Sequence, residues 1–156
     1  MKSIIIALAL LATSLTGWAQ TINDVFKKFK EMENVTYVNI PKSVVGMALK
    51  SAGKDTVANW ADKIDTIQIL SLEEASVSTK QLFNAEVKKL DTSGYEDMIK
   101  VNSEGEKVRI LTKGTEKIIT SLIIFAIDEN DCALVKIDGR IAPDEVNAIV
   151  DNQTRN

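Results

Sequence analysis

The spacing of apolar residues along the chain alternates between helical and strand-like periods, which predicts alternating helices and strands. Apolar residues recur every three or four positions over 22–33, 41–52 and 75–90, as on one face of a helix. A run rich in β-branched and aromatic residues at 35–40 favours one short strand. At 66–72, Ile67 and Ile69 lie on one face and Gln68 on the other, which favours a second. A further short helix is expected before the second strand, with one apolar side made of Val57, Trp60, Ala61 and Ile64.

From residue 95 onward the pattern favours four consecutive strands, at 95–102, 107–113, 117–127 and 132–138. Short turn-like segments connect them, as antiparallel hairpins require.

The chain ends with a predicted helix. Pro143 suits the first helical position, and the two acidic residues after it complement the helix dipole, so a helix is expected to about Val150. Residues 152–156 are expected to be frayed. The predicted fold class is therefore α+β: a mixed sheet ending in a four-stranded antiparallel meander, with helices packed against it.

The strand predicted at 117–127 is unusual because both of its faces are apolar. Ile123 and Phe125 lie on one face, whereas Leu122 and Ile124 lie on the other. One explanation is a central strand that helices cover on both sides. The other is a second face that a partner covers, which would make it a dimer or docking surface. The candidate binding residues on that face are Leu111, Leu122, Ile124 and Leu134.

The N-terminus has the three parts of a secretory signal peptide. Lys2 supplies the positive charge, Ile4 to Leu15 form an apolar run of about twelve residues, and small residues flank a cleavage site between Ala19 and Gln20. This run is too short for a membrane anchor, which needs about 18 to 25 apolar residues. Gln20 also stands where a lipid-anchored protein would carry cysteine. We therefore expect a cleaved signal peptide at 1–19 and an unanchored single domain at 20–156, located in the periplasm or secreted.

Composition narrows the classes of partner. The chain has 19 basic and 22 acidic side chains, a net charge of −3, and loss of Lys2 makes the mature chain one unit more negative. No lysine-rich run or basic amphipathic helix offsets this charge, so neither nucleic acid nor a membrane surface is an expected partner.

Cysteine and histidine counts limit the chemistry. The single Cys132 cannot form an internal disulfide, and it is expected to be a buried structural thiol. Without histidine the chain lacks the usual general base and the commonest transition-metal ligand. No metal site and no cofactor are predicted.

The remaining candidates for chemistry are weak patterns. Ser51 and Lys54 match a Ser-x-x-Lys pair, but Gly53 interrupts it at a helix end and no partner motif follows. Glu73-Glu74 and the acidic turn 128–131 are carboxylate clusters, which are usually solvated turn residues. Glycosidic hydrolysis would need two carboxylates at a defined separation, and a calcium loop would need a glycine and a distal glutamate. No catalytic residue is assigned.

The C-terminal half resembles a known family. The segments that carry the resemblance are Tyr95–Val101, Lys107–Leu111, the apolar strand after Lys117, and Leu134–Asp138 followed by Gly139-Arg140-Ile141. They are similar to the domain-of-unknown-function family numbered 4252 (DUF4252), and the resemblance covers most of the mature chain. It implies a small exported protein of Bacteroidetes with no assigned activity, and it brings over no catalytic residue. It also implies that Asp55-Thr56-Val57 and Asp65-Thr66-Ile67 are candidate O-glycosylation tripeptides.

The expected function is therefore binding rather than catalysis. We expect an exported interaction protein of the cell envelope, whose partner is a second copy in a homodimer or another envelope protein. The alternative is a hydrolase whose carboxylates, or Ser51 with Lys54, meet only in the fold. A deep cleft containing carboxylates with raised pKa values would favour the enzyme, whereas a shallow surface with an apolar patch would favour the binding protein.

Overall fold

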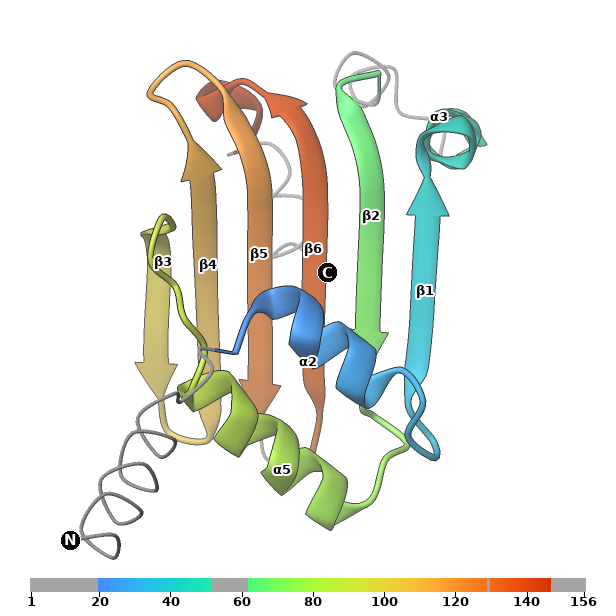
Figure 1. Ribbon diagram of the computed structural model, residues 1–156, viewed down its shortest axis with the longest axis vertical. Helices are drawn as coiled ribbons and strands as arrows, with labels where there is room; N and C mark the ends of the chain where they lie inside the picture. Colours follow the sequence, from blue (N-terminus) through green and yellow to red (C-terminus); the bar gives the residue numbers. More distant parts are fainter. Residues whose placement is uncertain (1–19, 52–61, 129, 147–156) are drawn as a thin grey trace, which may run out of the picture.

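The computed structural model describes residues 20–51, 62–128 and 130–146, and it contains a six-stranded sheet with helices against it (Figure 1). Helices α2 (Ile22–Phe29) and α5 (Val77–Lys88) lie on one face of the sheet, and α3 (Lys42–Ser51) follows β1 at one end (Figure 1). The strands are β1 (Thr36–Pro41), β2 (Ile64–Ser71), β3 (Glu96–Ser103), β4 (Glu106–Gly114), β5 (Ile119–Asp128) and β6 (Cys132–Ile141). This arrangement confirms the α+β class.

The strand order is β1-β2-β6-β5-β4-β3, and every neighbouring pair is antiparallel. The expectation of a sheet with mixed strand directions is therefore wrong. The last four strands pair with their sequence neighbours, as their hairpin-like connections predict, and β6 also pairs with β2. Because of that pairing, β5 and β6 lie in the middle of the sheet, while β1 and β3 are its two edges.

Helix α2 begins at a complete capping box. The Thr21 hydroxyl accepts a hydrogen bond from the Asp24 backbone N–H at 3.2 Å, and the Asp24 carboxylate accepts one from the Thr21 backbone N–H at 3.0 Å. The helix ends at Phe29, four residues earlier than the apolar spacing predicts. The following residues turn toward Asn34, which adopts a left-handed conformation with φ of 58°.

Two helices build the core on the helix-side face of the sheet. The rings of Phe29 on α2 and Phe83 on α5 meet edge to face, with centroids 5.2 Å apart and planes at 83°. Lys28 on α2 also forms an ion pair with Glu86 on α5 at 3.1 Å, and hydrogen bonding to Lys28 lowers the pKa of Glu86. The buried members of this core are Ile22, Val25, Phe26, Phe29, Leu70, Leu72, Ala75, Phe83, Leu111, Ile123, Phe125, Cys132 and Leu134.

The opposite face of the sheet, here called the outer face, carries a second apolar cluster. In the register of the sheet, one row of side chains crosses all six strands and is entirely aliphatic: Val38, Ile69, Val135, Ile124, Ile110 and Ile99. At one end of this face the cluster is closed by Val45, Ile64, Ile119, Ile141 and Val146, all of them buried.

Some predicted boundaries differ from the structure for identifiable reasons. Ile64 was expected on a short helix, but it is the first residue of β2 and is fully buried in the outer-face cluster. Its other apolar positions, 57, 60 and 61, lie outside the described residues, and 62–63 form a turn. The last strand continues through Gly139 to Ile141. Residue 139 must be glycine, because the Lys63 carbonyl lies within 2.3 Å of where a Cβ would be. Residues 143–146 are helical, as predicted, and 147–150 are not described.

We expect truncation of Phe83 to destabilise the protein strongly, because its ring is fully buried between α5 and α2. Phe83→Ala should lower the free energy of unfolding by about 3–5 kcal/mol, the usual cost of removing a buried aromatic ring. Leu82→Ala, at the neighbouring position with 36% exposure, is the matched control and should cost far less. Urea denaturation measures both, and equal losses in the two variants would contradict this assignment of the core.

Candidate functional site

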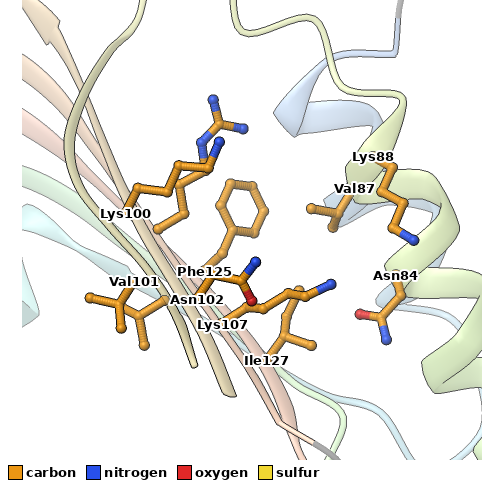
Figure 2. Close-up of a pocket in the computed structure, with 11 residues that line it drawn as sticks. Asn84, Val87, Lys88, Lys100, Val101, Asn102, Lys107, Phe125 and Ile127 are labelled. Carbon is orange, nitrogen blue, oxygen red and sulfur yellow. The ribbon is translucent and has the colours of Figure 1, made fainter. Parts of the chain in front are cut away.

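A groove of about 300 Å³ lies between α5 and the edge of the sheet formed by β3 and β4 (Figure 2). It forms because the helix-side positions at 100–102 of β3 and 107–109 of β4 are polar, whereas the neighbouring helix-side positions Phe125 and Ile127 of β5 are apolar. The groove is therefore bounded by a helix on one side and by the exposed side of a hairpin on the other.

The floor of the groove is apolar. Phe125 from β5 is only 2% exposed, and Ile127, two residues further along the same strand, is half-buried. Val87 projects from α5 toward Phe125 across the groove (Figure 2). A ligand that reaches this floor would bury an apolar group against an aromatic ring and two aliphatic side chains.

The walls of the groove are basic. Lys100 of β3 lies directly opposite Arg109 of β4 in the strand register, and Asn102 lies opposite Lys107. Like charges that face each other across an antiparallel pair destabilise it. Three cationic side chains are thus gathered on one face of the β3–β4 hairpin, and two of them, Lys100 and Arg109, face each other directly.

Arg109 is partly compensated by Asp97. Its guanidinium donates to the two Asp97 carboxylate oxygens, from Nε at 2.6 Å and from an Nη at 3.2 Å. Hydrogen bonding to Arg109 lowers the pKa of Asp97, and hydrogen bonding to Asp97 raises the pKa of Arg109. The pair holds the guanidinium at the groove wall in a fixed orientation.

The lysines of the groove are more available than Arg109. Lys88 from α5, together with Lys100 and Lys107, is exposed, and the ion pairs found within the described ranges involve none of these three. Asn84 and Asn102 add amide groups to the lining. The described residues that line the groove include four cations and no carboxylate, although the chain as a whole is acidic. The arrangement is suited to an anion attached to an apolar group.

The predicted apolar binding set does not lie on one face. Leu122 and Ile124 are on the outer face, where Leu122 is buried and Ile124 is half-buried. Leu111 pairs with Ile123, and Leu134 pairs with Phe125, so both point toward the helices and are buried in the helix-side core. Their grouping with Leu122 and Ile124 is therefore wrong. Sequence spacing gives the alternation within one strand, but the register that relates neighbouring strands comes only from the fold.

The outer face remains partly accessible at both edges of the sheet. Val38 on β1 is 40% exposed, and Val101 on β3 is 47% exposed. A role of this face as a docking surface or homodimer interface stays a prediction.

Within the described residues, the fold does not bring the candidate catalytic side chains together. Ser51 is exposed and donates its hydroxyl proton to the Met47 carbonyl at 3.0 Å, as in an ordinary helix, while Lys54 is not described. Glu73 and Glu74 are exposed in the turn between β2 and α5. Neither glutamate lines the groove.

The acidic turn is held by its own hydrogen bonds. The Asp128 carboxylate accepts from the backbone N–H groups of Asn130 at 2.7 Å and Asp131 at 2.6 Å, an Asx-type turn. Lys80 of α5 donates to the Asn130 carbonyl at 2.6 Å and ties the turn to the helix. Within the described ranges, no group of three or more metal-binding side chains occurs.

Cys132 is buried, as predicted, with 1% exposure. Burial is the main reason that its pKa is raised, and its thiol lies 3.9 Å from the Asn84 side-chain oxygen. The candidate glycosylation residue Thr66 is half-buried in β2 and bonds to Asp138 at 3.4 Å, while 55–57 lie outside the described ranges.

Sequence reasoning missed the groove, although its signal is present. Lys100 and Asn102, like Lys107 and Arg109, alternate with aliphatic residues at the period of a strand. Pairing these two strands as a hairpin would have placed all four polar side chains on one face. Their position beside α5 could not have been predicted, because it depends on where the helix packs.

The fold and the groove define a small α+β protein with a helix-flanked antiparallel sheet and a basic site at one edge. Residues 29–149 match the family described as Domain of unknown function (DUF4252), and the chain belongs to this family. No curated protein matches the chain, and no solved structure matches it. Among the helices of the described residues, none is long and apolar enough to cross a membrane.

We expect the Asp97 carboxyl to titrate at a lower pH than an ordinary aspartate, because the Arg109 guanidinium stabilises its charged form. A lowered pKa in the folded state means that the pair adds stability above the unfolded pKa, and that this stability is lost as pH falls through the folded pKa. Carboxyl chemical shifts measured by NMR should follow this titration. Arg109→Gln should return the pKa of Asp97 toward the usual aspartate range, and an unchanged value would contradict the pairing.

Proposed function

We propose that this protein is an exported, non-catalytic binding protein whose groove holds an anionic ligand with an apolar part. The observation that carries the proposal is the lining of the groove, whose described residues include four cations and no carboxylate beside the buried Phe125 ring. Asp97 already pairs with Arg109, so the unmatched charge belongs to the three exposed lysines, which take part in none of the ion pairs within the described ranges. An anion bound in the groove would pair with these lysines.

The size and the lining of the groove support the same ligand class. A volume of about 300 Å³ is at the lower end of the range of small-ligand sites, about 300–1,000 Å³. The apolar floor would bind the hydrocarbon part by burial, while the lysines at the walls would bind the charge. Because the lysines are exposed, the charge interaction should weaken with added salt.

The residues that the groove brings together support a binding protein over a hydrolase. Hydrolysis on this chain would require carboxylates with raised pKa values or an activated nucleophile. The groove is lined by cations and amides, and the shifted carboxyl pKa values among the described residues are lowered, as at Asp97 and Glu145. Export is supported by the N-terminal apolar run and the small residues before Gln20.

We expect the protein to bind octanoate, and to bind the neutral alcohol octanol more weakly, because only the carboxylate interacts with the lysines. Lys100→Gln and Lys107→Gln should each weaken octanoate binding about two- to fivefold, the usual effect of one exposed ion pair. Isothermal titration calorimetry at low salt measures these affinities.

Lys117→Gln is the matched control for these variants. Lys117 is an exposed lysine in the turn at the far end of β4, so its loss changes the net charge equally but leaves the groove intact. Its affinity for octanoate should equal that of the unmodified protein. Equal binding of octanol and octanoate, or an equal loss in the Lys117 variant, would count against the groove as the site.

A further inference from the structure

The strand that forms the outer wall of the groove is also an edge of the sheet. β3 is the last strand in the order, and on the side away from β4 it pairs with no other described strand (Figure 1). A register shift between Asp97 and Ile99 interrupts the start of β3, so the regular part of this edge is 99–103. Its free backbone N–H and C=O groups can pair with an added extended chain.

The two faces of this edge differ in chemistry. On the groove side, Lys100 and Asn102 are exposed next to Lys107 of β4. On the outer face, Ile99 is half-buried and Val101 is 47% exposed. The apolar outer face therefore remains partly exposed to solvent at β3. On the groove side this edge therefore presents one cation of its own, Lys100, with Lys107 on the neighbouring strand, while its outer face is apolar.

We propose that the β3 edge binds an extended peptide segment in which acidic and apolar residues alternate, and that this segment adds to the sheet as a seventh strand. Its acidic side chains would lie on the groove side near Lys100 and Lys107, and its apolar side chains would cover Ile99 and Val101 on the outer side. Side chains in a strand alternate between faces, so one chain satisfies both requirements at once. The inference rests on the proposed function in one respect: the same groove-side lysines bind the anionic groups, whereas the apolar side chains of the peptide lie on the outer face and not on the groove floor.

The other edge of the sheet does not offer the same features. On the helix side of β1, the Tyr37 ring lies 6.0 Å from the Phe26 ring of α2, so the helix layer already packs there. Pro41, at the end of β1, lacks a backbone N–H for a new ladder. The groove and its lysines lie at the β3 edge alone among the described strands.

A second copy of the chain is a poor occupant of this edge for electrostatic reasons. Two β3 edges paired with each other would bring the Lys100 side chains of both copies to one face of the joined sheet, and a lysine on an edge strand opposes such self-association. An acidic strand is favoured instead, because each of its carboxylates gains a lysine of opposite charge. The lysines therefore favour an acidic partner and disfavour a second copy of the chain.

The test uses a capped peptide with the central pattern Val-Glu-Val-Glu-Val, flanked by Gly-Ser at each end and carrying a fluorescent label. We expect it to bind the full protein in fluorescence anisotropy, and to slow hydrogen exchange at backbone amides within 99–103. Replacing both glutamates of the peptide by glutamine should weaken binding about five- to twentyfold, since two exposed ion pairs are lost.

A second peptide isolates the strand pairing. The same sequence with N-methyl groups on alternate backbone nitrogens keeps its side chains but cannot donate hydrogen bonds along one edge. There are two ways to place the methyl groups, and the one that blocks the edge facing β3 should weaken binding about tenfold or more. Equal binding of the parent and both methylated peptides, or exchange protection at 36–41 instead of 99–103, would overturn strand addition. Octanoate binding without peptide binding would overturn this inference and leave the proposed function intact. Binding of neither probe would reject both.

Discussion

This structure depends on one constraint. Side chains alternate between the two faces of a wide antiparallel sheet, and the helix layer covers only part of one face. Two short helices pack against each other, with Phe29 against Phe83, and share one buried cluster with strands of the sheet. Strands β5 and β6 accordingly carry buried apolar residues on both faces. Over 99–102 of β3 and 107–110 of β4 the outer-face positions are aliphatic, while the helix-side positions are basic or amide-bearing.

The groove is a direct consequence of this mismatch. A wider helix layer would have required apolar residues where Lys100 and Lys107 stand, and a narrower one would have left Phe125 in water. As built, a buried aromatic ring lies beside three exposed lysines that form none of the ion pairs within the described ranges. Cations of this kind next to an apolar surface suit an anion with an apolar part. The free edge of β3 then adds backbone hydrogen-bonding groups to the same wall.

Much of the fold could be predicted from the sequence, because local signals determine it. Period-two alternation and turn residues predicted the four C-terminal strands, and apolar spacing predicted α2 and α5. What depends on packing could not be predicted. Ile64 fits a helical face as well as a strand, and only its pairing opposite Gly139 places it in β2. Leu111 and Leu134 were expected beside Leu122, but the register between strands turns them toward the helices. The groove was missed for the same reason, since its lysines gain meaning only when β3 pairs with β4 beside α5.

The most direct test of the account is to map where an amphipathic anion binds, using backbone amide chemical shifts recorded by NMR during a titration with octanoate. The account predicts that the largest changes cluster around Val87, Lys100 and Lys107, at the groove walls. Changes clustered instead on the outer face, around Val38, Ile69 and Val135, would contradict it.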